Sequence, residues 1–373
     1  MALYLDVHTA DGGGRAAPAG AAPAPSGRPQ QPPGRGPGAG PRVSVVAAAV
    51  LMIAALAAAA LAMTLVTGPD AEAGDHRHAG HAGPVAADYV AIGAVPAVRP
   101  APRPGPGAST GSFTSRCGRN TEGHRNSDNF IVAPGVTNGA HHVHDYVGNT
   151  STDGTSTDQS LAAASTTCAR GDKSVYFWPV LRDIRHAGPD ADRPGGGRDG
   201  NLGHILTPAE VSLEFLGNPR AKVRSMPRFL RIVTGDAKAV TKGADARARA
   251  AWSCSGTPGR SSSTHYPLCR PGELVQRVGE FPSCWNGADT DSADHRTHVT
   301  FPDRTGACPT GTVPIPRLRI TLSYDVPPGR SFAVDSFPDQ QRKAVTDHFD
   351  FANLMPGSLM SQVVDCVNTG RSC

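Results

Sequence analysis

Aromatic side chains are scarce in this sequence: Phe, Trp and Tyr make up only 5% of its 373 residues, against 43 glycines and 34 prolines. That balance indicates a core surrounded by long irregular loops. The sequence also has no HExxH motif and no Walker loop, which argues against zincin proteases and P-loop nucleotide hydrolases. No two cysteines have the CxxC spacing, so zinc binding by thiolates is the weaker explanation of the cysteines.

A strong charge of either sign is missing as well. The formal net charge is +4, and the lysines and arginines are scattered along the chain. Proteins that bind nucleic acid usually concentrate their basic residues in a patch or stripe. Nucleic acid is therefore not an expected partner.

One long apolar run is present. Residues 44–66 carry no charge, and as a helix they are long enough to cross a hydrocarbon core of roughly 30 Å. Arginines precede the run and Asp70, Glu72 and Asp75 follow it, which predicts an N-terminus inside and a C-terminal part outside the cell. We expect a transmembrane signal anchor over residues 44–67. The alternative is a signal peptide cleaved after Ala73, which would make the protein secreted.

All eight cysteines follow this run, and an even number on the exported side predicts a disulfide framework. They are Cys117, Cys168, Cys254, Cys269, Cys284, Cys308, Cys366 and Cys373. Short loop-closure distances favour Cys254 with Cys269, Cys284 with Cys308 and Cys366 with Cys373. Cys117 is then left to pair with Cys168.

Composition divides the chain into four expected parts. They are a disordered cytoplasmic Pro/Gly-rich segment (1–43), the apolar helix (44–67), a flexible linker (68–111) and a disulfide-stapled extracellular domain (112–373). Short β-branched or alternating runs predict strands at 174–181, 209–215, 229–234, 298–301 and 318–326, and helical spacing predicts one helix at 358–366. The expected fold is mainly β, with a β-sandwich-like core, long loops, few short helices and a single N-terminal transmembrane helix.

Three segments concentrate histidine and aspartate: GAHHVHDYVG at 139–148, DTDSADHRTHVTFP at 289–302 and VTDHFDFAN at 345–353. On an extended strand His142 and His144 point to the same side, and so do His348 and Asp350. Each segment alone is better explained as a structural polar network in a loop. Because three separate segments supply both imidazole and carboxylate, we expect them to converge in one cleft.

Convergence would give either a divalent-metal site or an acid–base site, since both chemistries use these side chains. The candidate metal ligands are His142, His144, His298 and His348. The candidate catalytic residues are Asp291, Asp294, Asp350, His144, His295 and His348. The candidate substrate contacts are Trp178, Trp285 and Arg296, with core packing as the alternative role of the two tryptophans.

The residues FIVAPGVTNGAHHVHDYVGNTST, YFWPVL, FPSCWNGADTDSADHRTHV and DHFDFAN resemble the secreted bacterial and fungal family called domain of unknown function nineteen ninety-six. The resemblance covers about residues 125–370. It implies an exported protein, often associated with the cell wall or surface, and brings no activity with it. The family pattern includes, from the three segments, His142, His144, Asp291, His295, Arg296, His298, His348 and Asp350, together with Trp178 and Trp285. Asn286 departs from it, since many members have aspartate there.

Two classes of function stay open. The first is an extracellular enzyme that acts on a polysaccharide or a cell-wall glycan through the His/Asp segments. The second is a non-catalytic surface module that binds a glycan or a divalent metal through the same residues, or a structural envelope protein. A divalent metal ion is the candidate cofactor in both classes. The expected partners are the membrane, through residues 44–67, and a cell-wall glycan.

Overall fold

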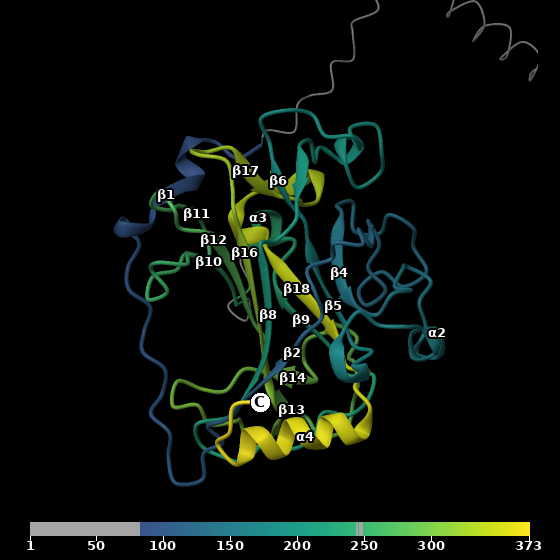
Figure 1. Cartoon of the computed structure of the whole chain (residues 1–373), viewed down its shortest axis with the longest axis vertical. Helices are drawn as coiled ribbons and strands as arrows, with labels where there is room; N and C mark the ends of the chain where they lie inside the picture. The colour runs from purple at the N-terminus through teal and green to yellow at the C-terminus, as the bar shows by residue number, and fades with distance from the viewer. Residues whose placement is uncertain (1–82, 244, 246–248) are drawn as a thin grey trace, which may run out of the picture. The chain divides into compact units, whose positions relative to one another are not determined.

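Two five-stranded antiparallel sheets form the centre of the part of the chain that the computed structural model describes, residues 83–243, 245 and 249–373 (Figure 1). The first, here called the core sheet, has the order β10 (Ala250–Cys254), β12 (Val275–Glu280), β16 (Arg317–Tyr324), β8 (Glu210–Leu216) and β2 (Ser112–Ser115). The second, here called the site sheet, has the order β3 (Arg125–Asn126), β4 (His144–Gly148), β5 (Val175–Pro179), β18 (His348–Ala352) and β9 (Arg231–Gly235).

Smaller elements surround these two sheets. The remaining strands are β1 (Tyr89–Ala91), β6 (Leu181–Asp183), β7 (His204–Leu206), β11 (Tyr266–Leu268), β13 (Cys284–Trp285), β14 (Val299–Thr300), β15 (Val313–Pro314) and β17 (Phe332–Val334). The α-helices are α2 (Asp158–Ala163), α3 (Ala239–Lys242) and α4 (Gly357–Asn368). The 3₁₀ turns are η1 (Ala86–Asp88), η2 (Ile92–Ala94), η3 (Ala169–Gly171), η4 (Gly197–Asp199), η5 (Pro338–Gln340) and η6 (Ala344–Thr346).

Alternating side chains explain why the two sheets pack face to face. In β16 the inward residues Leu318, Ile320 and Leu322 are buried, as expected for a strand with one face on a core. The Phe215 ring of the core sheet lies 6.1 Å from the Phe351 ring of the site sheet. A Cβ at Gly279 would come within 2.6 Å of the Phe349 ring, so only glycine allows this close approach.

Several predicted elements lie close to their expected positions. Strands β5, β8, β9, β14 and β16 overlap the predicted strand segments, and α4 overlaps the predicted helix. The long stretch 174–181 ends as a strand at Pro179, and a separate strand, β6, begins at Leu181. Helix α4 buries Leu359, Val363 and Cys366 on one face, at the spacing that predicted it.

The fold prediction needs one correction, the membrane-spanning helix. Among residues 83–243, 245 and 249–373, no helix is both long enough and apolar enough to cross a bilayer. The segment to which that helix was assigned, residues 44–67, lies outside the described residues, as do residues 1–43 and 68–82. The described residues therefore form a mainly β domain with several sheets, few helices and four disulfides, and none of their helices is long and apolar enough to span a membrane.

Part of the segment expected to be a linker packs against the domain. Residues 89–91 form β1, which pairs in parallel with β11. The Tyr89 ring is buried, and its hydroxyl donates a 2.6 Å hydrogen bond to the Phe332 carbonyl. Ile92 and Val95 are also buried, beside Cys254. The packed domain therefore begins before residue 112.

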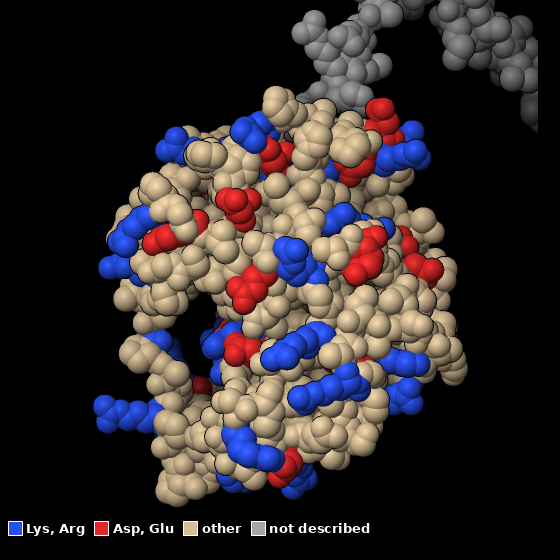
Figure 2. Space-filling view, in the orientation of Figure 1, with Lys and Arg blue, Asp and Glu red and all other residues tan. Residues whose placement is uncertain are grey.

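On the face of the domain shown in Figure 2, basic and acidic side chains are scattered among other residues that cover most of its area. Pairs of opposite charge on a surface contribute little to stability and largely cancel each other's long-range field. This face therefore presents no broad field of one sign.

All eight cysteines are paired as the loop lengths favoured. The bridges are Cys117–Cys168, Cys254–Cys269, Cys284–Cys308 and Cys366–Cys373, with sequence separations of 51, 15, 24 and 7 residues. No cysteine is free in the described part of the chain. The thiols therefore offer no metal ligand in this oxidised form.

We expect the Cys117–Cys168 bridge to contribute most to stability. A bridge that closes a loop of 51 residues restricts the unfolded chain by about 4 kcal/mol, and one that closes 7 residues by about 2 kcal/mol. Chemical denaturation of the Cys117→Ala/Cys168→Ala and Cys366→Ala/Cys373→Ala variants should show this difference in unfolding free energy. Equal losses in the two variants would mean that loop closure does not govern their contribution.

Candidate metal centre

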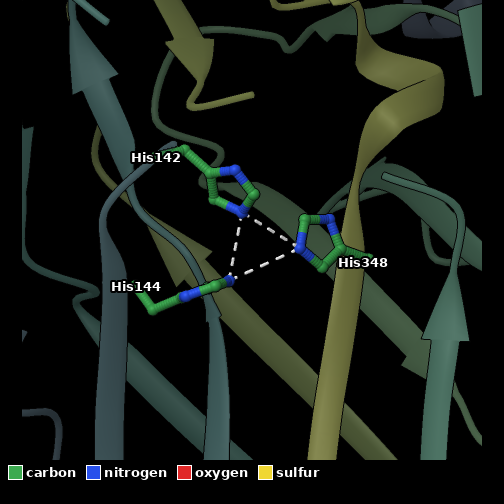
Figure 3. A group of neighbouring side chains, drawn as sticks. All are labelled: His142, His144 and His348. Atoms are coloured by element: carbon green, nitrogen blue, oxygen red, sulfur yellow. Dashed lines mark hydrogen bonds between the residues drawn. The ribbon is translucent and has the colours of Figure 1, made fainter. Parts of the chain in front are cut away.

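Three imidazoles from two of the predicted segments meet at one point (Figure 3). The Nε2 atoms of His142 and His144 are 3.1 Å apart, those of His142 and His348 are 3.2 Å apart, and those of His144 and His348 are 3.5 Å apart. All three side chains are buried, and His348, at 7% exposed, is the most accessible of them.

The register of the site sheet explains how His144 and His348 meet. His144 on β4 pairs with Pro179 on β5. On the other side of β5, Asp350 of β18 pairs with Phe177, and the same antiparallel register brings His348 level with Pro179. Since paired residues share a face, both imidazoles project to the same side of the sheet, where their Nε2 atoms lie 3.5 Å apart.

The backbone between His142 and His144 is held from two sides. The Val143 amide donates to Asp335 Oδ2 at 3.3 Å, and the Val143 carbonyl accepts from the Val180 amide at 2.9 Å. His141, just before, has a φ of 53°, an uncommon conformation for a residue with a side chain. The Asn201 side chain donates to the His141 carbonyl, which supports this bend. The His142-Val143-His144 segment is thus fixed in place before any ligand binds.

Hydrogen bonds on the far side of two rings determine where their protons lie. His144 Nδ1 is 2.9 Å from the Asp128 carbonyl, and His348 Nδ1 is 2.9 Å from the Thr346 carbonyl. Because a carbonyl oxygen only accepts, each Nδ1 must carry the proton, and each neutral ring then has a bare lone pair at Nε2. This is the arrangement by which proteins orient imidazoles that bind metal ions.

His142 differs from the other two, since its Nδ1 makes no hydrogen bond of normal geometry with a described residue. Its ring packs edge-on against Phe337, with the centroids 5.2 Å apart. A neutral His142 can carry its single proton at Nε2, but it can then donate a hydrogen bond to only one of its two neighbours, His144 or His348. At least one contact in the cluster therefore joins two lone pairs, unless a cation lies between them.

Burial keeps all three rings neutral. It lowers the pKa of His142 and of His144 well below the usual value, and neighbouring histidines add to the effect. Burial lowers the pKa of His348 to about 4, and the charges of Arg277 and Arg296 act in the same direction. Neutral imidazole is the form that binds a metal ion, so the cluster is ready to bind at neutral pH.

The spacing of the nitrogens fits a tetrahedral metal ion. Three nitrogens bound to zinc at about 2.0–2.1 Å with tetrahedral angles lie about 3.3 Å apart. The three observed separations, 3.1, 3.2 and 3.5 Å, surround that value. His142, His144 and His348 could therefore hold such an ion and leave one coordination position for water or another ligand.

Asp350 lies on β18 two residues after His348, on the same face of the strand. It is buried, and its Oδ2 has no hydrogen-bond partner among the described residues. Burial raises its pKa to about 7, although a hydrogen bond from Asn129 and the charge of Arg296 oppose this shift. It is not one of the residues whose ligand atoms meet in the cluster.

The DHRTH segment lies beside β9, at the edge of the site sheet. Arg296 Nη2 donates to the Gly235 carbonyl at 2.8 Å, and Gly235 is the ladder partner of His348. His298, a predicted metal ligand, uses both ring nitrogens elsewhere, with Ser292 Oγ at 2.9 Å and the Arg231 carbonyl at 2.6 Å. Its imidazole therefore holds the segment against β9 and has no free nitrogen for a metal.

The other predicted acid–base residues of this segment also have structural partners. His295 Nδ1 lies 3.0 Å from both carboxylate oxygens of Asp291. Asp294 accepts hydrogen bonds from the backbone amides of Arg296 and Thr297, and although desolvation opposes ionisation these donors hold its pKa below the usual range. Both carboxylates thus stabilise the turn of their own segment.

The two candidate tryptophans occupy different environments. Trp178 is fully buried in the main core, so its indole offers no face to a substrate. Trp285 is partly exposed on β13, and its Nε1 donates to the Asp289 carbonyl at 2.7 Å. The position of Trp178 therefore indicates a role in core packing.

Arg277 is a supporting residue that the sequence did not single out. It projects from β12 of the core sheet and is fully buried. Its guanidinium binds both carboxylate oxygens of Asp347, at 2.5 and 3.1 Å, and donates to the Pro179 carbonyl at 2.7 Å. It thereby fixes the backbone beside His348 and His144. Its one signal in the sequence is a charge at an inward position of the alternating VQRVGE run.

A family model supports the grouping of these segments. The model described as Domain of unknown function (DUF1996) matches residues 129–356, a range that contains all three histidines, Asp350 and Arg296. No curated protein and no solved structure matches the chain. Because the matched range covers more than half of the chain, this protein belongs to the DUF1996 family.

Proposed function

We propose that this domain binds one divalent transition-metal ion, with Zn²⁺ as the simplest case, through the Nε2 atoms of His142, His144 and His348. The observation that supports it is the meeting of three buried, neutral imidazoles at 3.1–3.5 Å, two of them with their protons fixed on the far side. A cation satisfies all three lone pairs at once, whereas hydrogen bonds among the rings cannot.

The open coordination position gives such a centre its chemical capacity. A zinc ion held by three histidines keeps one position for water or another ligand and can lower the pKa of bound water toward neutrality. Sites that are only structural usually fill all four positions with protein atoms. The protein's own residues would bind and orient the ion here, and Asn129 would hold the Asp350 carboxyl nearby.

Both classes of function expected from the sequence can use a divalent metal ion, and the geometry of the cluster supports this shared feature. Action on a glycan through paired carboxylates would need Asp291 or Asp294 to be available, and both have partners within their own turn. The four disulfides support a location in an oxidising compartment, and we propose an extracellular one.

Calorimetric titration of the chelator-treated protein tests this proposal. We expect one Zn²⁺ to bind per chain and to raise the melting temperature, because a ligand that binds only the folded state stabilises it. Mg²⁺, which prefers oxygen ligands, serves as the control and should not bind at this site. Absence of Zn²⁺ binding, or a stoichiometry unaffected by removal of a cluster histidine, would overturn the proposal.

A further inference from the structure

The charges around the histidine cluster are balanced without the metal. Three buried or partly buried ion pairs surround it: Arg277–Asp347 at 2.5 Å, Arg182–Asp335 at 2.7 Å and Arg125–Asp145 at 2.5 Å. Each joins an arginine to a carboxylate, so together they add no large net charge. Three neutral imidazoles also add no charge. The charge of +2 on a bound divalent ion would therefore not be neutralised by its three ligands.

Arg296 adds a further positive charge at the same place. Its guanidinium lies at the carbonyl of Gly235, and the backbone of β9 there is one strand spacing, about 4.8 Å, from that of His348. Among the described residues, the Gly235 carbonyl is the one acceptor of a hydrogen bond from this guanidinium. The N–H groups on its Nε and Nη1 atoms can therefore donate to a ligand. No carboxylate within the described ranges forms an ion pair with it.

A small hollow lies next to this guanidinium. It is lined by Arg296, by His295 and His298 of the same segment, and by Val233 of β9. Val233 is the ladder partner of Asp350, whose Oδ2 is buried without a partner. The edge strand β9, next to β18, thus has a small hollow beside it, with Arg296 at its wall.

A divalent ion in the buried cluster and the half-buried guanidinium of Arg296, whose charge acts on His348 and Asp350, together favour more negative charge than Asp350 alone supplies. Burial of unbalanced charge is costly, and the usual remedy is a charged ligand. Carboxylate and phosphate oxygens suit both partners, because they bind zinc directly and accept two hydrogen bonds from the planar guanidinium.

On the basis of the proposed metal binding, we infer that the ion held by the three histidines takes an oxyanion, a phosphate or carboxylate group, as its fourth ligand, and that Arg296 binds the same group. The metal supplies the directional bond, and Arg296 selects a charged oxygen ligand over a neutral hydroxyl. The ligand class is therefore an anionic molecule or an anionic polymer end, rather than a neutral sugar.

Cobalt provides the readout for this inference. Co²⁺ replaces Zn²⁺ in tetrahedral sites, and its visible absorption changes when the fourth ligand changes. The full-length Co²⁺-loaded protein is titrated with inorganic phosphate, with acetate and, as a neutral control, with glucose. We expect spectral titration by both anions and none by glucose.

The matched variants are Arg296→Gln and Arg304→Gln, the second an exposed arginine of the following loop. Loss of a charge-assisted hydrogen bond should weaken anion binding by roughly 10- to 100-fold in Arg296→Gln, with no change in Arg304→Gln. Arg296→Lys should recover part of the loss, because it keeps the charge without the planar donor pair. Metal affinity should be unchanged or a few-fold tighter in Arg296→Gln, since a repulsive charge has been removed.

The possible failures can be told apart. If Co²⁺ does not bind, the proposed metal centre fails and the anion site fails with it. If Co²⁺ binds and the anions leave its spectrum unchanged, or if Arg296→Gln binds them as tightly as the original protein, metal binding stands and the anion inference is overturned.

Discussion

Replacement of His144 by glutamine is expected to remove tight metal binding, while replacement of His265 by glutamine leaves it unchanged. His144 supplies one of three Nε2 atoms at the cluster, whereas His265 is exposed and contacts Thr264. Loss of an outer partner of a metal ligand already costs about 10- to 100-fold in affinity, and loss of the ligand itself must cost more. Glutamine fills most of the space of the imidazole, so a loss of metal binding reflects the missing ligand atom rather than a cavity.

The measurement is metal-linked thermal stability. With free Zn²⁺ at about 1,000 times its dissociation constant, the original protein should gain about 4 kcal/mol of unfolding free energy. His144→Gln should gain almost none under the same conditions, and His348→Gln should behave alike. Removal of both histidines should cost little more than removal of one, because the two belong to the same site. A full Zn²⁺-dependent gain in either variant would argue against the centre.

Replacement of Asp347 by alanine is expected to destabilise the fold by about 3–5 kcal/mol, because it leaves the fully buried Arg277 without its carboxylate. Burial opposes the charge on Arg277, and Asp347 is what keeps the pKa of the guanidinium above its usual value. The control is Asp365→Ala, which breaks the exposed pair with Arg371 and should cost at most about 1 kcal/mol.

The double variant Arg277→Met/Asp347→Ala sharpens this prediction. Replacement of both members of a buried ion pair by apolar side chains is often nearly neutral, so the double variant should be more stable than Asp347→Ala alone. Chemical denaturation measures both effects, and zinc titration of the folded variants should show an affinity loss of roughly 10- to 100-fold, since this pair fixes the backbone next to His348. An Asp347→Ala cost no larger than that of Asp365→Ala would contradict this role.

The sequence predicted that all three His/Asp segments converge in one cleft, and the structure brings together His142, His144 and His348, which come from two of them. Alternate residues of a strand share a face, and neutral histidines concentrated in two strand-like segments are costly to bury unless they share a partner. The DHRTH segment shows the limit of that reasoning. Composition alone does not distinguish His348, whose Nε2 faces the cluster, from His298, whose two nitrogens hold a loop against β9.

The supporting residues could not be predicted because they act across long separations in sequence. Arg277 contacts Asp347 from the opposite sheet, and Asp335 accepts from the Val143 amide over 192 residues. These contacts depend on which strands are neighbours, and an order such as β4-β5-β18-β9 does not follow from local pattern. The disulfide pairing was easier to predict, because loop lengths of 7 to 24 residues strongly favour three local pairs and leave one remaining pair.

X-ray absorption at the zinc edge of the loaded protein tests the central claim most directly. Three histidines and one lighter ligand predict nitrogen or oxygen neighbours at about 2.0–2.1 Å, with the outer-shell scattering of three imidazole rings. The imidazole contribution should fall by a third, or the zinc should be lost, in His144→Gln. Zinc bound by sulfur at about 2.3 Å, or by oxygen atoms without imidazole, would contradict the three-histidine centre.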